Sequence, residues 1–430
     1  MSTPLAFIAT CDLVGLVRGR SLSRDAVVNH GKSVGWVPAD LSLNAFCGID
    51  DDNPFGSVGD LRLLPDLSTE ITLPSIGAAA PLSIFLANQV LPDGSPWSSC
   101  PRTHSQESIA QLKAVHGIDL VASFEHEFAL TSLMPIPEGS AFGLDSFRIA
   151  EPFGSELVSL LESNGLEPEN WLAEYGANQF EITVKPSPAM IAADRAVLLR
   201  EIVRDTARRH GLRASFVPLV SPTAVGNGVH VHLSLSKNGL PITFDPTQPG
   251  NLSELASFAA AGILAHAGAL QAWTAPSQIS ALRLQPHRWS SAGIFAAVQD
   301  REALLRICPL TTLNGADPAA SFNLEYRAAD ATSNPWLVIS VLARAITAGI
   351  TAGKRVDPIH TEPISYEDPS IKRLPESITK AIESLKSDPE VLSWFSEELL
   401  AAHLGIRASE EIELSGLTDE EKCERYSRVY

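Results

Sequence analysis

The sequence predicts an α+β fold with a small N-terminal domain at residues 1–98 and a larger domain at residues 99–430. The chain has 430 residues, enough for two or three domains of ordinary size. Hydrophobic residues make up 45% of it and charged residues 19%, values typical of a globular protein with a sizeable core. Short strand-like runs and turns occupy the first part, whereas longer helical patterns alternate with strands beyond a linker at residues 94–102.

The N-terminal domain is expected to consist of short strands joined by turns. Residues 6–12 form an apolar run typical of a strand, and Gly15 begins a turn. Residues 46–56 have the sequence FCGIDDDNPFG, which is rich in turn formers and predicts a loop. Residues 60–66 alternate polar and apolar side chains before a proline, which favours another strand.

The clearest helix of the larger domain is expected from Ser187 to about His210. Ser187 is a favourable N-cap residue, Pro188 suits the first helical position, and Gly211 ends the pattern. Between these ends, apolar side chains recur at helical spacing, so one side of the helix is expected to be buried.

Two more helices are expected towards the C-terminus. Asn334 begins one of them by the same capping logic, and the helix continues through the apolar stretch at 336–353. Because Arg344 interrupts this stretch, which is rich in Ala and Gly, we expect a buried helix and not a membrane span. The other helix is expected at 375–385, with an amphipathic and exposed character.

The charge and the cysteines indicate a cytoplasmic protein without nucleic-acid or membrane partners. The chain has 32 basic and 50 acidic residues, and its net charge of −18 repels phosphate backbones and anionic lipids. Its five cysteines are widely spaced and include no C-x-x-C pair, which favours a reducing compartment over a disulfide framework or a zinc site. The first residues lack a basic region and include Asp12, so no secretory signal is expected.

Four short segments present polar side chains within apolar sequence. They are SFEHEF with Glu125 and Glu127, EYGANQFEITV with Glu174 and Glu181, GVHVHLSL with His230, His232 and Ser234, and FNLEYRAAD with Glu325 and Arg327. Residues two apart on a strand point to the same face, so each strand is expected to have one polar and one apolar face. A solvent-exposed edge strand explains any single segment. Four such segments together favour a shared site, since a buried, unpaired charge is too costly.

The chemistry of these side chains indicates divalent cations and a phosphorylated substrate. Five carboxylates with one or two imidazoles suit Mg²⁺ or Mn²⁺, and their number favours two ions. The guanidinium groups of Arg283, Arg301, Arg306 and Arg327 lie in nearby segments and are suited to binding carboxylate or phosphate. Metal ions combined with arginines are a recurring arrangement for phosphoryl transfer. The sequence contains no glycine-rich nucleotide-binding loop.

In this order, the segments resemble the motifs of the glutamine synthetase family over nearly the whole chain. The matching motifs are Gly-Asp-x-x-x-x-Pro-Asp at 59–66, Glu-x-Glu-Phe at 125–128, Gln-x-Glu-Ile at 179–182, Ala-Ala-Asp at 192–194, Gly-x-His-x-His-x-Ser at 228–234, Arg-Leu-x-Pro at 283–286, Arg-x-x-x-x-Arg at 301–306, Glu-x-Arg at 325–327, Asn-Pro at 334–335 and Leu-Pro-x-Ser at 374–377. The resemblance implies a β-grasp N-terminal domain and a catalytic domain with a curved antiparallel sheet flanked by helices. It also implies a homo-oligomer, a dodecamer of two hexameric rings.

The resemblance implies a role for each polar residue. The implied ligands form two metal sites: Glu127, Glu174 and Glu181 in one, and Glu125, His230 and Glu325 in the other. The residues implied to bind ATP are His232, Ser234, Arg301 and Arg306. Arg301 and Arg306 are also implied to bind the phosphorylated intermediate, and Arg283 and Arg327 are implied to bind the carboxylates of the acid substrate, glutamate or a similar amino acid. The implied reaction is phosphorylation of a side-chain carboxylate by ATP, followed by attack of an amine to give an amide.

Departures from the family pattern bear on the amine. Trp289 occupies the place of a mobile glutamate that helps to deprotonate ammonium in glutamine synthetases, so an apolar wall or cation–π surface replaces a negative charge. The family's Met-Pro-Lys-Pro motif lacks its lysine at 217–220, Val225 replaces an asparagine, and Ala320 replaces a lysine. The acid that reaches a neighbouring subunit's site has its candidates at 50–52.

Three functions follow from these features. The first is an ATP-dependent ligase that couples glutamate to an amine other than ammonia, giving a γ-glutamyl amide, with Trp289 in the amine pocket. The second is a conventional glutamine synthetase with a remodelled ammonium site. The third is a catalytically silent member with a structural or binding role.

Overall fold

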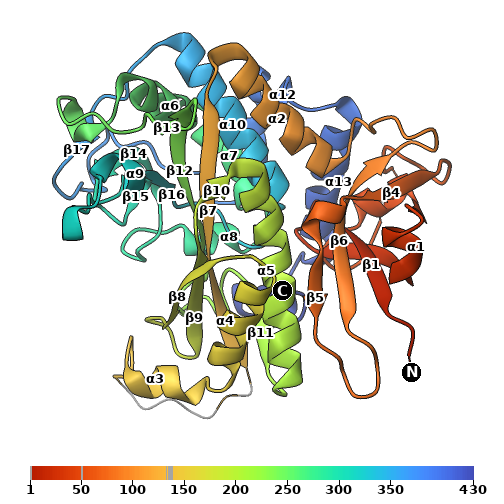
Figure 1. Ribbon diagram of the computed structural model, residues 1–430. Helices are drawn as coiled ribbons and strands as arrows, with labels where there is room; N and C mark the ends of the chain where they lie inside the picture. The colour runs from red at the N-terminus through yellow and green to blue at the C-terminus, as the bar shows by residue number, and fades with distance from the viewer. Residues whose placement is uncertain (1, 50–51, 132, 134–138) are drawn as a thin grey trace.

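The computed structural model describes residues 2–49, 52–131, 133 and 139–430, and contains two β-sheets with helices packed around them (Figure 1). Asp50 and Asp51, two candidate acids, lie outside the described residues. The N-terminal part, red and orange in Figure 1, lies beside the larger part, with the yellow-green helix α5 between the two sheets. The predicted α+β class is confirmed.

The N-terminal sheet has six strands in the order β2-β1-β6-β4-β3, with β5 also paired to β6. Their bounds are β1 Leu5–Cys11, β2 Val17–Ser23, β3 Val34–Trp36, β4 Leu61–Pro65, β5 Ile71–Leu73 and β6 Leu82–Val90. β1 and β6 run parallel, and the other pairs are antiparallel. The strands predicted at 6–12 and 60–66 correspond to β1 and β4. The division of the chain between residues 98 and 99 remains a prediction.

The larger sheet has eleven strands, with the main order β17-β14-β15-β16-β12-β7-β9-β8. The bounds are β7 Asp119–Thr131, β8 Pro168–Ala173, β9 Gln179–Val184, β10 Ser187–Pro188, β11 Arg213–Ser215, β12 Val229–Lys237, β13 Leu240–Pro241, β14 Gly293–Val298, β15 Ala303–Ile307, β16 Leu324–Tyr326 and β17 Ile359–His360. The expected antiparallel pairing holds for most of the sheet, but β14 runs parallel to both β15 and β17.

Helices cover these sheets. Their bounds are α1 Arg24–Val28, α2 Pro101–His116, α3 Leu144–Ile149, α4 Phe153–Ser163, α5 Ala189–Arg209, α6 Glu254–Ala265, α7 Ala267–Thr274, α8 Ser280–Arg283, α9 Pro318–Ser321, α10 Pro335–Ala352, α11 Ile378–Lys386, α12 Pro389–Leu392, α13 Glu397–Glu413 and α14 Asp419–Ser427. Within the described part of the chain, α10 is the one unbroken helix long and apolar enough to span a membrane, and 78% of it is buried inside the protein. This burial agrees with the prediction of a core helix.

Two helix starts differ from the sequence prediction. α5 begins at Ala189, and the predicted N-cap Ser187 makes no capping bond because Ser187 pairs with Ala122 of β7 at the sheet edge. α11 begins at Ile378, three residues after the predicted start, because the Ser377 hydroxyl accepts a hydrogen bond from the Lys380 N–H. The predicted start of α10 is confirmed, because Asn334 caps this helix. The predicted end of α5 is also confirmed, because Gly211 has a left-handed φ of 70°.

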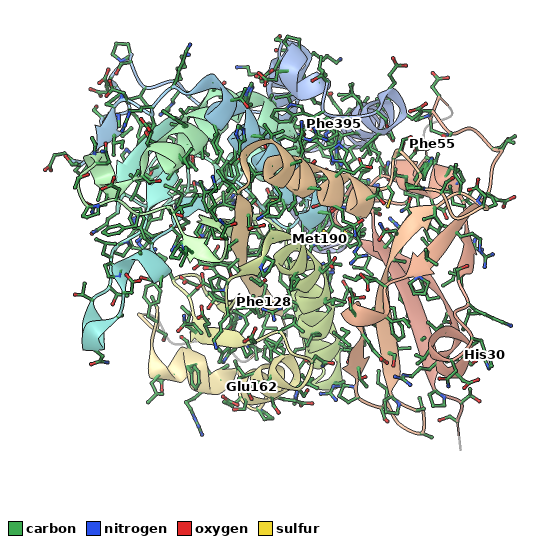
Figure 2. All side chains as sticks on the ribbon, turned by 45° about the horizontal axis from the view of Figure 1, so that its top comes forward. His30, Phe55, Phe128, Glu162, Met190 and Phe395 are labelled. Carbon is green, nitrogen blue, oxygen red and sulfur yellow. The ribbon has the colours of Figure 1, made fainter. Side chains whose placement is uncertain are left out.

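A single large core connects the two parts of the molecule. It includes buried side chains of β1 and β6 from the small sheet, together with those of α5, α10 and the larger sheet. Phe128 of β7, labelled in Figure 2, lies within a cluster of rings, 5.2 Å from Phe216 and 6.0 Å from Trp171 between ring centroids. This packing fixes the apolar face of β7 and leaves the opposite face for polar side chains.

Candidate active site

Strand register brings the predicted polar residues onto one face of the larger sheet. The directly opposed pairs are Arg306 with Glu325 (β15 and β16), Glu325 with His232 (β16 and β12), His230 with Glu125 (β12 and β7), and Glu127 with Glu181 (β7 and β9). Opposed residues and residues two apart share a face, so all of these side chains point the same way. Glu174, directly after β8, joins them through its N–H, which donates to the Gln179 carbonyl at 2.8 Å.

Glu127, Glu174 and Glu181 form one acidic group, and an oxygen of each lies within 4.8 Å of the others. Burial raises the pKa of Glu127 to about 7 and that of Glu181 to about 9, and the neighbouring carboxylates add to both shifts. Burial also raises the pKa of Glu174. Carboxylates that resist ionisation together are stabilised by a cation among them, and an all-oxygen donor set suits a hard divalent ion.

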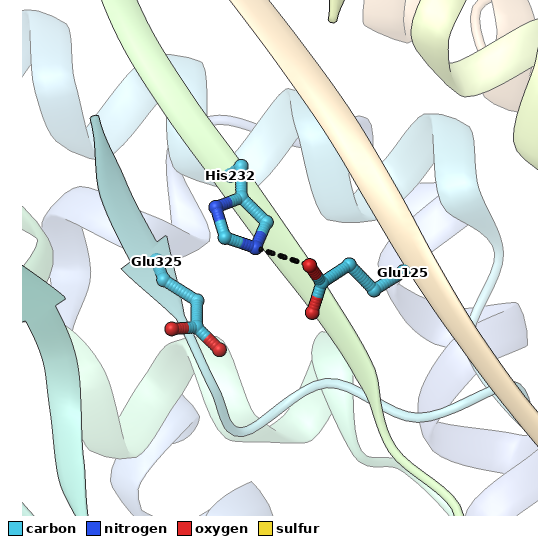
Figure 3. Close-up of side chains that lie close together, drawn as sticks. All are labelled: Glu125, His232 and Glu325. Atoms are coloured by element: carbon cyan, nitrogen blue, oxygen red, sulfur yellow. Dashed lines mark ion pairs between the residues drawn. The ribbon is translucent and has the colours of Figure 1, made fainter. Parts of the chain in front are cut away.

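Glu125, His232 and Glu325 form a second group, shown in Figure 3, with ligand atoms again within 4.8 Å of one another. His232 Nε2 lies 3.0 Å from a Glu125 oxygen. His230 Nδ1 lies 3.5 Å from oxygens of both Glu125 and Glu325. The resemblance implied His230 as the imidazole of this site and His232 on the nucleotide side, whereas the geometry brings both rings to the carboxylates. This mixed oxygen and nitrogen set also fits a divalent ion such as Mn²⁺.

The protonation states of the second group differ from those of the first. Burial alone would raise the pKa of Glu125, but the imidazoles of His232 and His230 hold it well below its usual range. Burial would lower the pKa of His232, but Glu125 raises it well above its usual value. A protonated His232 therefore supplies the positive charge that balances Glu125, and a metal ion bound here would displace that proton.

Neighbours of His232 orient its ring. The Asn323 Oδ1 lies 2.8 Å from Nδ1, so Nδ1 donates to it and Nε2 faces Glu125. The Cys308 sulfur lies 3.8 Å from the same Nδ1. Neither residue was expected at the site from the sequence, because no motif or repeated spacing marks Asn323 or Cys308 as a neighbour of His232.

Glu325 lies at the centre of an arginine network. It is 1% exposed, and its carboxylate forms ion pairs with Arg306, at 2.8 Å, and with Arg327. Arg327 also donates to the backbone carbonyls of Arg301 and Trp289, each at 2.9 Å. The Arg327 side chain, expected at the acid substrate, is therefore directed towards Glu325 here. Its charge, followed by those of the His230 and His232 imidazoles, holds the pKa of Glu325 at about 2 against the effect of burial.

Arg283 and Arg301 have different surroundings. Arg283 is buried and donates to the carbonyls of Ala328 and Ala329 at 2.7 and 2.8 Å, while its Nε lacks a partner among the described residues. The exposed Arg301 side chain makes no hydrogen bond or ion pair within the described part of the chain, so its guanidinium is available to an anion.

These side chains surround a cavity of about 810 Å³. Its lining includes five of the six expected metal ligands, all except Glu325, and all four expected arginines. His232 and Ser234, expected near ATP, are not part of the lining, and Ser234 lies opposite Val121, further along β12. An ion at the second site would therefore lie at the edge of the cavity.

Three aromatic rings line the same cavity. Trp289 is 61% exposed, and its ring centroid lies 5.8 Å from that of Tyr175. The Tyr175 ring lies 6.4 Å from that of Phe142. We call Phe142, Tyr175 and Trp289 the aromatic wall. Of these three rings, only that of Trp289 was expected from the sequence, although Tyr175 directly follows the acidic residue Glu174 and could have been inferred from that position.

Comparisons with known proteins agree with this architecture. Residues 98–426 match the family model "Glutamine synthetase, catalytic domain", and residues 3–97 match "Glutamine synthetase N-terminal domain". The chain is 31% identical to the gamma-glutamylpolyamine synthetase GlnA3 of Streptomyces coelicolor, over 98% of this chain and 93% of the relative. It is 28% identical to the glutamine synthetase of Thermus thermophilus, over 86% of this chain and 85% of the relative.

Solved structures show the same fold. A crystal structure described as a novel glutamine synthase homolog has a TM-score of 0.93 and 38% identity, covering 100% of this chain and 99% of that one. A GmaS/ADP complex has a TM-score of 0.83 at 24% identity, covering 98% and 96% of the two chains, and supports the fold alone. The matched motifs, the two acidic groups and both family models lead to one conclusion. The chain belongs to the glutamine synthetase family of ATP-dependent carbon–nitrogen ligases.

Proposed function

We propose that the protein couples an organic amine to the side-chain carboxylate of glutamate, forming a γ-glutamyl amide with ATP as the energy source. The observation that carries this proposal is the aromatic wall, which lies in the same cavity as the acidic residues and arginines. Ammonia gains little from contact with three rings, whereas the carbon skeleton or charge of an organic amine gains from both apolar contact and cation–π attraction. The similarity to a gamma-glutamylpolyamine synthetase supports the same choice.

The two acidic groups are the proposed sites for two divalent ions, Mg²⁺ or Mn²⁺. Glu127, Glu174 and Glu181 would hold one ion. The other ion would be held by Glu125, Glu325 and an imidazole, with His232 nearest and His230 also within reach. When bound, the ions would supply positive charge beside the phosphates of ATP.

The arginines are proposed to bind the anions of the reaction. Arg301 lines the cavity, its guanidinium makes no hydrogen bond or ion pair with the residues that the structure describes, and it would bind the transferred phosphoryl group together with Arg306. Arg283 lines the cavity, its Nε has no hydrogen-bond partner in the described part of the protein, and it would bind a carboxylate of glutamate. Arg327 would join it after releasing part of its network with Glu325.

The proposed reaction has two steps. A side-chain carboxylate oxygen of glutamate attacks the γ-phosphorus of ATP, the bond from phosphorus to the bridging oxygen breaks, and ADP leaves with the electron pair. The amine nitrogen then attacks the activated carbonyl carbon, phosphate leaves with the carbon–oxygen bond pair, and the nitrogen loses a proton. Activation is needed because a free carboxylate is a poor electrophile, and the arginines stabilise the charge that develops on phosphate.

A panel of amines tests this proposal. Phosphate release would be measured with ATP, glutamate and Mg²⁺ or Mn²⁺, first without an amine and then with ammonia, monoamines, diamines and polyamines. We expect release with at least one organic amine at concentrations where ammonia gives far less. Preference for ammonia would favour the conventional glutamine synthetase, which several relatives represent. No release with any amine would favour the catalytically silent protein.

We further propose a cytoplasmic homo-oligomer, a dodecamer of two hexameric rings. Family membership supports an oligomer, and exposed apolar side chains such as Val58, Leu144 and Leu313, 83%, 74% and 74% exposed in the single chain, are candidates for subunit contacts. Light scattering coupled to size-exclusion chromatography would give a mass near twelve times 46.0 kDa for a dodecamer.

A further inference from the structure

The segment that carries Trp289 has an unusual backbone. His287 and Trp289 have φ angles of 63° and 52°, in the left-handed region that bulky residues rarely adopt. Such a conformation persists only where other contacts hold it. The contacts that hold this segment therefore control where the Trp289 ring lies.

Both strained residues are held by one carboxylate. Glu302, directly before β15, accepts hydrogen bonds from the His287 N–H at 2.9 Å and from the Trp289 N–H at 2.7 Å, one on each oxygen. A carboxylate with two backbone donors forms charge-assisted bonds, which are stronger than neutral ones. Glu302 is not part of the cavity lining, and these two hydrogen bonds connect its carboxylate to the segment that carries Trp289.

The Glu302 carboxylate is itself fixed from another side. The Tyr366 hydroxyl donates to it at 3.1 Å. The Arg373 guanidinium lies 4.6 Å from the centre of the Tyr366 ring, and the His287 ring meets the same tyrosine edge-on at 5.8 Å. Tyr366 and Arg373 thus support the carboxylate from outside the cavity.

Trp289 is held on its carbonyl side as well. Its C=O accepts from Arg327 at 2.9 Å, so Glu302 and Arg327 hold the two peptide groups of one residue. The indole itself projects from this fixed backbone and is largely exposed in the cavity. A small rotation of the segment would therefore move the ring out of the aromatic wall.

We propose that Glu302 is a positioning residue that fixes Trp289 in the aromatic wall and thereby determines which amines the cavity accepts. This inference rests on the proposed function, because it assigns the aromatic wall to the amine. Glu302 touches none of the reacting groups. Its effect should appear in the binding of the amine and not in that of ATP.

The test compares the wild-type enzyme with the Glu302→Gln variant. The amide nitrogen of Gln would face a backbone N–H, so at least one of the two bonds is lost. Hydrogen exchange of the 287–290 amides should accelerate about tenfold or more, as expected when a charge-assisted bond is lost. With the best amine of the panel, the KM for the amine should rise about tenfold, whereas the KM for ATP should change less than about twofold.

Two further variants complete the design. Glu367→Gln is the matched control, because Glu367 is an exposed acid on the same segment as Tyr366 and its carboxylate makes no hydrogen bond or ion pair with the described residues. Tyr366→Phe keeps the ring beneath Arg373 and removes only the hydroxyl, so its effects should be smaller and in the same direction. If the Glu302→Gln variant does not fold, the same measurements on Tyr366→Phe test the proposal.

The outcomes separate the two proposals. Unchanged exchange at 287–290 in Glu302→Gln would overturn the positioning role, whether or not an amine is a substrate. Faster exchange with an unchanged amine KM would overturn the role in selectivity. If the wild-type enzyme has no turnover with any organic amine, the proposed function fails and the selectivity role fails with it, while the exchange data still report whether Glu302 holds the segment.

Discussion

At the residue scale, Glu127, Glu174 and Glu181 repel one another when no cation lies among them. The raised pKa values of Glu127, about 7, and Glu181, about 9, mean that the folded protein binds more protons than the unfolded chain between about pH 4.5 and 9. Without metal, the free energy of unfolding should therefore fall as the pH rises through this window. A divalent ion bound by the three carboxylates should prevent this decrease in the free energy of unfolding.

Thermal unfolding measures this effect. In EDTA, the Tm should be lower at pH 9 than at pH 6, and excess Mn²⁺ should raise it more at pH 9 than at pH 6, because protons then compete less for the carboxylates. The Glu181→Gln variant, which lacks the group with the larger shift, should show a weaker pH dependence in EDTA. Equal stabilisation by Mn²⁺ at both pH values would contradict the assignment of these acids as ligands.

Two acids of the site should respond differently to removal. Glu127→Ala should abolish metal-dependent turnover with little change in the free energy of unfolding, because the remaining acids are relieved of repulsion. Glu325→Ala should also abolish turnover, but it leaves Arg306 and Arg327 without their buried partner and should cost about 3 kcal/mol. Urea unfolding, with the exposed Glu367→Ala as control, measures the difference. Turnover that survives either change would remove the two-ion proposal.

Trp289 offers a direct test of amine selectivity. Trp289→Glu replaces an exposed ring by a negative charge, so it should fold normally and attract ammonium. The ratio of kcat/KM for ammonia to that for the preferred organic amine should rise about tenfold, equivalent to about 1.4 kcal/mol. Trp289→Phe keeps a ring in the aromatic wall and is the matched control. An unchanged ratio would mean that Trp289 does not contact the amine.

At the element scale, the alternation of polar and apolar residues predicted the faces of the strands but not their neighbours. Glu125 and Glu127 were expected on one face, and they lie there. The short distance between His232 and Glu125 depends on the register between β12 and β7. This register arises from the pairing of segments that are distant in the sequence. Local sequence carries no signal for such a register.

Helix caps show the same limit. Ser187 met every local requirement for an N-cap, but its pairing with β7 placed it in the sheet. Asn334, by contrast, caps α10 through the Trp336 and Leu337 N–H groups and donates to the Cys11 and Asp12 carbonyls. Tertiary pairing therefore overrode one cap and reinforced the other.

A pair of alanine variants measures this difference. Ser187→Ala should change the free energy of unfolding by less than about 0.5 kcal/mol, because its buried hydroxyl has no hydrogen-bond partner among the residues described. Asn334→Ala should cost about 2 kcal/mol, because it removes the cap and the two hydrogen bonds that its amide donates to the Cys11 and Asp12 carbonyls. Urea unfolding of both variants checks this. A loss of about 1 kcal/mol for Ser187→Ala would indicate that Ser187 caps α5 after all.

At the scale of the whole molecule, the family motifs predicted the fold and the set of polar residues, whereas the aromatic wall was only partly predictable. Its rings come from Phe142, Tyr175 and Trp289, in three segments with no shared spacing or pattern. Glu302 escaped prediction for the same reason, since its partners are backbone N–H groups of another segment. Nearly every residue type has a backbone N–H, so a side chain that binds backbone groups cannot be predicted from the residue types of its partners.

Arg327 joins two regions of the enzyme through one rigid, planar group, because it pairs with Glu325 and also donates to the carbonyl of Trp289. An ion that binds Glu325 and weakens its ion pair with Arg327 should therefore also alter the hydrogen bond from Arg327 to the Trp289 carbonyl. Metal and amine should therefore influence each other's affinity by the same factor, as reciprocity between linked equilibria requires. Calorimetric titration of Mn²⁺ with and without the amine would measure that factor, and a value of one would mean that the two ligands are independent.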